Sequence, residues 1–275
     1  MLHRVSSNVL GRAACTRCFS ASIDPSSLQI ERTTAPKAKL PKEELAFGAS
    51  FTDHMLECDW DEANGWHAPR IIPYGNFAID PAASVFHYGI ECFEGMKAYL
   101  DADDNIRMFR PDCNMQRLND SMTRLFMPSF DGDAYLECIK ELLRVEKEWI
   151  PKGEGYSLYL RPTAIGTHPY IGVGPTKSAK LYTILSPVGP YYPSGFAPVK
   201  LLADDKYVRA WPGGTGNTKV GGNYGPTILP QMEAAQKGYT QVLWLFGGPG
   251  PENHTITEVG TMNLFFLWEK VGGGL

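Results

Sequence analysis

The chain has 275 residues, of which 43% are hydrophobic, and a formal net charge of −4. This length suits one large or two moderate domains with a substantial core. The mild acidity gives no indication of a nucleic-acid-binding surface, and no apolar run approaches the roughly 20 residues of a membrane-spanning helix. Neither nucleic acid nor membrane is therefore expected as a partner.

The start of the chain differs in kind from the rest. Three arginines and several serines precede the first acidic residue, Asp24, and apolar residues recur between the arginines at helical spacing. This pattern is typical of a mitochondrial transit peptide. We predict a transit peptide over residues 1–19, with cleavage after Phe19 and a final location in the mitochondrial matrix.

Residues 20–45 are rich in Ser, Thr, Pro and Lys and show no periodicity. This composition predicts a flexible segment, with ordered structure beginning near Phe47. Further on, two alternating segments at residues 96–100 and 106–110 flank a polar turn, which predicts a hairpin.

Two helices are expected after the hairpin. The first begins with Asp112 as its N-cap, and its apolar residues recur at steps of three and four, so that Arg117 lies off the apolar stripe. The second spans residues 134–149 and is ended by Pro151.

The rest of the chain predicts an α+β fold with two domains joined near residue 190. A helix is expected at 226–237, and the expected strands are residues 157–165, 180–189, 199–205, 241–246 and 261–270. A Pro-, Gly- and Tyr-rich stretch between the second and third of these strands resembles an interdomain connection. The predicted units are a small α/β domain at 46–188, a linker at 189–198 and a large domain from 199 to 275.

The cysteines and histidines predict neither disulfides nor a metal site. Cys58, Cys92, Cys113 and Cys138 are scattered singly, which favours reduced and mostly buried thiols. The histidines show no metal-ligand spacing, so no metal site is expected.

Lys219 is the only lysine in the glycine-rich stretch GGTGNTKVGGNYGPT. A phosphate loop needs glycine before the lysine and Ser or Thr after it, but Thr218 and Val220 occupy those places, which argues against a nucleotide site. A Schiff-base lysine needs a lowered pKa, which desolvation or a nearby positive charge such as Arg209 supplies. From these residues alone, a pyridoxal-phosphate lysine and an exposed lysine in a glycine-rich turn both remain open.

A second segment, ITEVGTMNLFF, resembles the Glu-x-Gly-x-x-Asn-Leu-Phe signature of class IV pyridoxal-phosphate aminotransferases. The stretches TKVGGNYG and QVLWLFG, with FTDHML, HYGIECFEGMKAY, FRPDCNMQRL and SLYLRP upstream, resemble the branched-chain amino-acid group of that family. The resemblance runs in colinear order from about Phe47 to Trp268. It implies a two-domain fold-type IV α+β architecture, of which the chain carries only the first part of the large domain.

The resemblance also implies pyridoxal 5′-phosphate as cofactor and a homodimer that exchanges amino groups between Leu, Ile or Val and 2-oxoglutarate. Lys219 matches the lysine that holds the cofactor and then moves a proton. Glu258 matches the partner of the pyridine nitrogen, Tyr224 that of the phenolic oxygen and Arg117 that of the 5′-phosphate. Arg209 and Thr261 complete the implied cofactor site.

The substrate pocket must accept both branched aliphatic side chains and the distal carboxylate of glutamate, which aromatic walls with a few polar tips can do. Arg161 is placed by the resemblance near the polar end, and Tyr88, Ile171 and Val173 reach in from a second subunit. The substrate residues implied are Phe47, Tyr88, Phe93, Tyr159, Arg161 and Tyr191. Taken singly, each of these is more typical of a core position, and Arg117 of a solvated helix face.

Two rival interpretations remain. A D-amino-acid aminotransferase or an aminodeoxychorismate lyase would share Lys219 and Glu258, although FTDHML and GGNYG favour the branched-chain group. Alternatively, the family's Gly-hydrophobic-Arg element does not follow Trp268, which predicts a truncated product that dimerises at most and is poorly soluble and nearly inactive.

Overall fold

The fold is described from a computed structural model, which places residues 22–190, 197–248 and 250–267. The predicted transit peptide and Tyr191 lie outside these residues.

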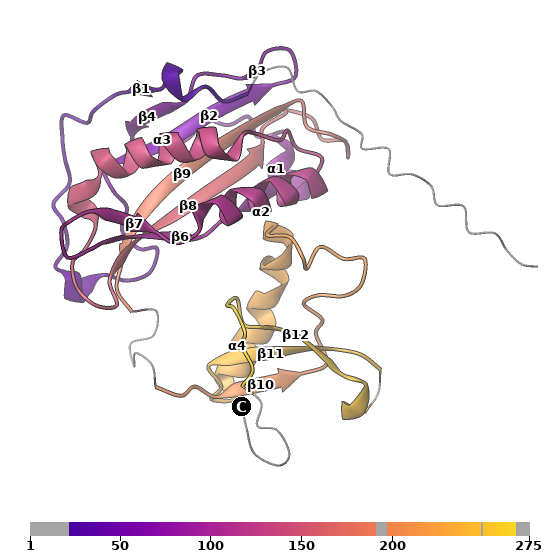
Figure 1. The fold of residues 1–275 in the computed structure, drawn as a ribbon. Coiled ribbons are helices and arrows are strands. Elements are labelled where there is room, and N and C mark those ends of the chain that lie inside the picture. The colour runs from indigo at the N-terminus through magenta and orange to yellow at the C-terminus, as the bar shows by residue number, and fades with distance from the viewer. Residues whose placement is uncertain (1–21, 191–196, 249, 268–275) are drawn as a thin grey trace, which may run out of the picture.

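The part of the chain before residue 190 forms one mixed sheet with helices packed on one face (Figure 1). Its strands run in the order β1-β4-β2-β9-β8-β6-β7, with β3 beside β2 and β5 beside β8. All of these pairs are antiparallel except β1 with β4. The strands are β1 (Gln29–Ile30), β2 (His54–Asp61), β3 (Gly65–Trp66), β4 (Arg70–Pro73), β5 (Glu91–Phe93), β6 (Met96–Leu100), β7 (Ile106–Met108), β8 (Ser157–Gly166) and β9 (Ser178–Val188).

Helices α2 (Pro111–Arg124) and α3 (Gly132–Val145) cover this sheet and bury their apolar stripes against it (Figure 1). Successive side chains of a strand point to opposite faces. In β8, Leu158 and Leu160 enter the helix-covered core, so Tyr159 and Arg161 face the other way. Shorter helical elements complete this part, namely α1 (Ser84–Tyr88) and 3₁₀ turns at Pro25–Ser27, Lys42–Glu44 and Lys147–Trp149.

A second, three-stranded sheet follows residue 197, with β10 parallel to β11 and β12 antiparallel to β11. One helix, α4, packs on this sheet: its residue Ala234 contacts Val242 and Trp244 of the central strand β11 in a small separate core. The elements are β10 (Leu201–Asp204), α4 (Ile228–Gln236), β11 (Gln241–Phe246), β12 (Thr255–Val259) and 3₁₀ turns at Gly221–Asn223, Gly225–Thr227 and Pro251–Asn253. The α+β class predicted from the sequence is confirmed.

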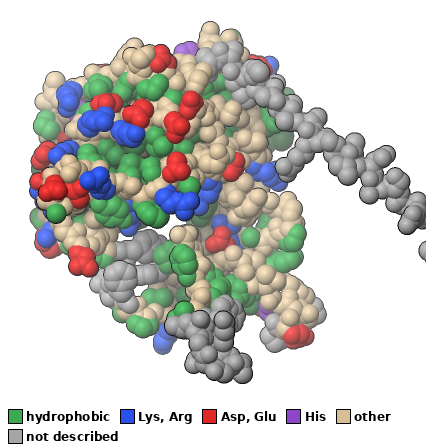
Figure 2. Space-filling view, viewed as in Figure 1, with side chains coloured by type: hydrophobic (Ala, Val, Ile, Leu, Met, Phe, Trp, Pro, Cys, Tyr) green, Lys and Arg blue, Asp and Glu red, His purple; other side chains and the backbone are tan. Residues whose placement is uncertain are grey.

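Charged side chains of both signs are interspersed over the face that carries α2 and α3 (Figure 2). On α3, Lys140 pairs with Glu137 and Arg144 with Glu141, as expected for a solvated helix surface. Among the helices in the described ranges, none has the length and apolar character needed to cross a membrane.

Ordered structure begins earlier than the sequence predicted. Ile23 is only 3% exposed, and β1 pairs with β4. The backbone N–H of Thr33 also donates to Nε2 of His54 at 2.8 Å. The prediction that ordered structure starts near Phe47 is therefore wrong.

The start of α2 also differs from the prediction. Arg110, not Asp112, occupies the N-cap position, with a left-handed φ of 46° and no side-chain cap. Pro111 is the first helical residue, where its fixed φ favours helix initiation and its missing N–H is not needed. Asp112 lies in the first turn instead, where its charge complements the helix dipole.

The second helix is shorter than predicted at its carboxyl end. The Asp131 side chain caps α3 by accepting from the N–H groups of Asp133 and Ala134. The α-helix ends at Val145, and a separate 3₁₀ turn covers Lys147–Trp149. The predicted helix over 134–149 therefore combines two elements.

The predicted strand at 261–270 is wrong over its described part, 261–267, which contains no strand. The strand of this region is β12, which precedes it. Gly260 follows with a φ of 51°, and a Cβ there would lie 1.9 Å from Oε1 of Gln241. This left-handed glycine turns the chain away, so the signature residues after it form a turn rather than a strand.

Candidate active site

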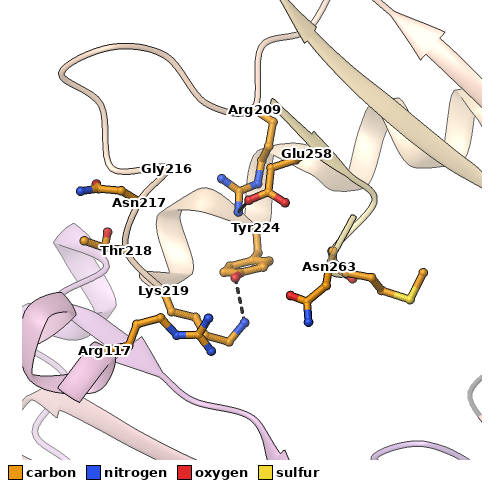
Figure 3. A pocket seen from close by; sticks show the side chains of 11 residues that line it. Arg117, Arg209, Gly216, Asn217, Thr218, Lys219, Tyr224, Glu258 and Asn263 are labelled. Carbon is orange, nitrogen blue, oxygen red and sulfur yellow. Dashed lines mark hydrogen bonds and ion pairs between the residues drawn. The ribbon is translucent and has the colours of Figure 1, made fainter. Parts of the chain in front are cut away.

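A pocket lies where the glycine-rich segment before α4 meets α2 and the turn after β12 (Figure 3). Every residue predicted to bind the cofactor lines it. The lining residues are Arg117, Arg209, Gly216, Asn217, Thr218, Lys219, Tyr224, Glu258, Thr261, Met262 and Asn263.

The backbone of Lys219 is fixed by contacts with one strand and one helix of the first part of the chain. Its N–H donates to Oγ of Ser121 on α2 at 2.9 Å. Its carbonyl accepts from the N–H of Phe93 on β5 at 3.0 Å, and Val220 forms a bridge with Cys92. The position of the lysine is thereby tied to β5 and α2, which lie roughly a hundred residues earlier in the sequence.

The glycine-rich turn is held together by its own polar side chains. Nδ2 of Asn223 donates to the carbonyls of Thr215 and Thr218 at 2.8 and 2.9 Å, and the Thr215 hydroxyl donates back to Oδ1 of Asn223. A Cβ on Gly221 would lie only 1.4 Å from Oε1 of Glu91. A larger residue at this position would have to displace the Glu91 side chain, so glycine lets the turn lie close to β5.

The Lys219 ammonium points into the pocket. Nζ donates to the phenolic oxygen of Tyr224 at 3.0 Å (Figure 3). It also lies 4.8 Å from the ring centroid of Phe93 and 5.1 Å from that of Tyr224. The described residues give this amine no carboxylate ion-pair partner, so it is placed to react with a ligand rather than held in a salt bridge.

Arg117 on α2 reaches the same pocket while its guanidinium is held from behind. Nε and Nη2 donate to the two carboxylate oxygens of Glu94 at 2.5 and 2.8 Å. These hydrogen bonds raise the pKa of Arg117, whereas burial opposes the rise. The guanidinium is therefore a permanently charged and oriented donor at the pocket wall.

Arg209 lies on the opposite wall, between Tyr224 and Glu258. It is 6% exposed, its guanidinium carbon lies 5.0 Å from the ring centroid of Tyr224, and Nη2 is 4.0 Å from Oε1 of Glu258. Within the described part of the chain, Nε and Nη1 are buried without a hydrogen-bond partner. Buried donors of this kind normally have acceptors, so this wall is suited to an oxygen-rich ligand.

A second group of predicted residues lies on the face of β8 and β5 turned away from the helices. Arg161 stacks 4.4 Å from the centroid of Phe93 and donates from Nη2 to the Tyr159 hydroxyl at 2.9 Å. Phe47 packs edge-on against Tyr159 at 4.8 Å. Because Lys219 also lies over Phe93, this aromatic group adjoins the lysine pocket.

Tyr88 lies apart from the other predicted substrate residues. Its hydroxyl donates to the carbonyl of Ile171. Tyr88, Ile171 and Val173 are all exposed large side chains at one edge of the fold. The structure therefore brings together Phe47, Phe93, Tyr159 and Arg161 but not Tyr88, and Tyr191 lies outside the described residues.

Several residues that shape the site were not singled out from the sequence. Glu94 orients Arg117, Ser121 fixes the Lys219 backbone, and Asn223 ties the glycine-rich turn. Asn263 lines the pocket and belongs to the signature segment, which was a usable signal. Glu94 and Ser121 had no comparable signal because their partners lie far along the chain.

The cysteines and possible metal ligands complete the inventory of reactive groups. Cys58, Cys92 and Cys138 are free and buried, and Cys113 is free and exposed. Burial raises the pKa of the Cys58 thiol to about 12, so this group is an unreactive core residue. Over the described residues, no group of three or more His, Cys, Asp or Glu side chains could hold a metal ion.

Comparison with known proteins identifies the family of the chain. The chain matches the amino-transferase class IV family over residues 91–271. It is 56% identical over 253 residues to the branched-chain-amino-acid aminotransferase of Monosiga brevicollis, which covers 92% of this chain and 64% of that protein. It is 50% identical over 274 residues to the mitochondrial branched-chain-amino-acid aminotransferase of Saccharomyces cerevisiae, covering 99% and 69% of the two. The chain thus spans about two thirds of the length of these relatives.

A solved branched-chain amino acid aminotransferase from T.th. with pyridoxamine 5′-phosphate has a similar fold. The TM-score is 0.52 at 26% identity, over 68% of this chain and 59% of that chain. The family match covers more than half of the chain, and the structural likeness covers about two thirds of it. The chain therefore belongs to the amino-transferase class IV family and has its fold-type IV architecture.

Proposed function

We propose that this protein catalyses transamination between the branched-chain amino acids Leu, Ile and Val and 2-oxoglutarate, with pyridoxal 5′-phosphate as cofactor. The observation that carries the proposal is the Lys219 amine, which faces a pocket built from a phenol, a carboxylate and two arginines. The names of the relatives, which are 50% and 56% identical, support the choice of substrate.

The residues present fit this cofactor. A phosphorylated pyridine with a phenolic oxygen and an aldehyde needs an anion-binding donor, a partner for the ring nitrogen, a phenol-binding group and an amine. Arg117, Glu258, Tyr224 and Lys219 supply these groups around one pocket. The partnerless buried nitrogens of Arg209, as described above, further favour a ligand rich in acceptor atoms.

Each side chain then has a defined task. Lys219 would hold the cofactor and, once released, carry a proton to and from the substrate Cα. Glu258 would keep the ring nitrogen protonated, and Tyr224 would hydrogen-bond the ring oxygen. Arg117 would bind the phosphate. The bound cofactor supplies a ring that accepts electrons from the substrate carbon.

The aromatic group beside the lysine pocket suits the two kinds of substrate. Phe93, Tyr159 and Phe47 offer apolar walls for a branched side chain, whereas the Arg161 guanidinium offers a cation for a distal carboxylate. Arg161 makes no ion pair with any residue of the described ranges, although its charge acts on the nearby Glu91 carboxyl group, so the guanidinium can still pair with a ligand.

We also propose a homodimer located in the mitochondrial matrix. The exposed edge with Tyr88, Ile171 and Val173 supports a second subunit, since exposed large apolar residues in one patch commonly mark protein contacts. Relatives named mitochondrial and cytosolic both occur at similar identity. The arginine-rich start of the chain favours the mitochondrial alternative.

The test is an amino-transfer assay with pyridoxal phosphate and 2-oxoglutarate, in which glutamate formation is measured with L-leucine, L-isoleucine, L-valine and D-alanine. We expect glutamate with the three branched L-amino acids and none with D-alanine. D-alanine as the better donor would identify a D-amino-acid aminotransferase. Pyruvate release from aminodeoxychorismate would identify the lyase instead.

A further inference from the structure

Glu94 is a fully buried carboxylate directly behind the pocket wall. It lies between β5 and β6 and is 0% exposed. Besides Arg117, its oxygens accept from Nδ2 of Asn114 at 2.7 Å and from the N–H of Gly95 at 3.2 Å. Four donor contacts on one carboxylate fix its plane, so the group that binds it in a fork is fixed as well.

The fork determines which part of Arg117 faces the pocket. A guanidinium has five N–H donors, of which Glu94 engages one on Nε and one on Nη2. The donors of Nη1 and the second N–H of Nη2 remain for the pocket that Arg117 lines. Glu94 thus selects the edge of the guanidinium that a ligand meets.

Two effects of Glu94 on an anion in the pocket oppose each other. Its negative charge offsets part of the attraction between Arg117 and the anion. Against this, the fork already fixes the Arg117 side chain. The rotamer entropy of this long side chain is therefore lost on folding and not when the anion binds, which favours anion binding. Because the Arg117 side chain is 48% exposed, solvent screens the charge effect, whereas the loss of orientation is not screened. Orientation is therefore the larger effect.

We propose that Glu94 is a positioning residue: it orients the Arg117 guanidinium so that Arg117 can bind the phosphate group of the cofactor. This inference rests on the proposed function, because it assumes that Arg117 binds the cofactor phosphate. It predicts that Glu94 acts on phosphate-bearing ligands and only through Arg117.

The experiment compares pyridoxamine 5′-phosphate with pyridoxamine, two amines that do not react with lysine and differ only in the phosphate. Their dissociation constants are measured by calorimetry for the wild type, Glu94→Gln, Arg117→Met and the double variant. We expect Glu94→Gln to reduce the preference for the phosphorylated ligand about tenfold. The double variant should match Arg117→Met, because Glu94 has no other route to the phosphate.

The matched control is Glu146→Gln, which removes another buried carboxylate, one that faces His54 and not the pocket. It should leave the preference unchanged even if it lowers stability. If Glu94→Gln does not fold, Glu94→Asp keeps the charge but shortens the fork, and should reduce the preference by a smaller factor.

The possible results distinguish a failure of the positioning role of Glu94 from a failure of the proposed function. An unchanged or larger preference in the folded Glu94 variant overturns the positioning role alone. A further loss in the double variant relative to Arg117→Met overturns it too, since Glu94 would then act independently of Arg117. A wild type without any preference for the phosphorylated ligand counts against the proposed function and, with it, against this inference.

Discussion

The phenol of Tyr224 lies 3.0 Å from Nζ of Lys219 and accepts its hydrogen bond. The two residues are five positions apart in one glycine-rich turn, and the rings of Tyr224 and Phe93 both lie close to the amine. The Asn223 side chain donates hydrogen bonds to two backbone carbonyls of the same turn. Because these bonds fix the turn, the amine and the phenol are held in place before any ligand arrives. Such preorganisation lowers the reorganisation needed during reaction.

Replacing Tyr224 by phenylalanine tests this relationship. The ring contact with Phe93 should survive, but the phenol that hydrogen-bonds Lys219 here, and would hydrogen-bond the ring oxygen of the proposed cofactor, is lost. A hydrogen bond to a charged group contributes about 1.5–3 kcal/mol, so kcat/KM for leucine should fall about tenfold to hundredfold. Steady-state kinetics measure this, with circular dichroism to verify folding. Full activity in the variant would show that the phenol has no role in the reaction.

Glu91 lies near the proposed substrate side of the pocket. Its carboxyl group rests on Gly221. Burial raises the pKa of Glu91, and the Arg161 charge partly opposes the rise. Glu91 pairs with Ile165 and Phe93 with Thr163 across β5 and β8, so Glu91 and Arg161 lie on the same face of the sheet. An ionised Glu91 therefore competes with a substrate carboxylate for Arg161.

We expect Glu91→Gln to shift specificity toward substrates with a distal carboxylate. Without the competing charge, the ratio of kcat/KM for glutamate to that for leucine should rise by about threefold to tenfold. The matched control is Asp59→Asn, which removes a carboxylate from the same sheet face that is paired with Lys180 instead. Equal shifts in both variants, or none in Glu91→Gln, would contradict the expectation.

Asp101 should make the β6–β7 hairpin sensitive to acid. It accepts from the N–H of Asn105 at 2.8 Å and from Nε of Arg107 at 2.8 Å. These hydrogen bonds lower the pKa of Asp101 to about 2. Because the folded-state pKa is depressed, the stabilisation is present above the ordinary aspartate value of 3.8 and is lost as the pH falls toward 2.

Thermal unfolding measured from about pH 7 to about pH 2 checks this. Asp101→Asn should have a lower Tm than the wild type at neutral pH, and the difference should shrink below pH 3.8 as the wild-type carboxylate takes up its proton. Asp103→Asn changes an exposed neighbour in the same turn and serves as the control. A Tm difference that stays constant throughout the acid range would exclude the carboxylate as its cause.

Local pattern in the sequence was sufficient for much of the fold. The apolar residues at steps of three and four along α2 and its C-cap are Met115, Leu118, Met122 and Leu125, of which the first three are buried and Leu125 is partly buried, because helical periodicity reports directly on a buried face. Strand composition likewise identified β8 and β11. The prediction failed at 261–267, where the apolar residues resemble a strand but Gly260 turns the chain. A single backbone conformation outweighed the composition there.

The candidate site was accessible from the sequence only where a motif carried it. Lys219, Tyr224 and Glu258 were found through family resemblance, and they line one pocket. Glu94 was not found because its partner Arg117 lies 23 residues away. A single glutamate in the sequence gives no sign that it is buried or paired. Contacts of this range depend on how β5 and α2 pack, which no local pattern encodes.

Labelling of the lysine that holds the cofactor is the most direct test of the role proposed for Lys219. The protein is incubated with pyridoxal phosphate, reduced with borohydride, digested, and analysed by mass spectrometry for the modified lysine. Label on the peptide that contains Lys219 is expected, with Lys219→Ala losing both the label and, by about a thousandfold or more, the transfer of amino groups from leucine. Lys237→Ala, which changes an exposed lysine after α4, should retain both. Label on another lysine in the wild type, or undiminished activity in Lys219→Ala, would contradict the account.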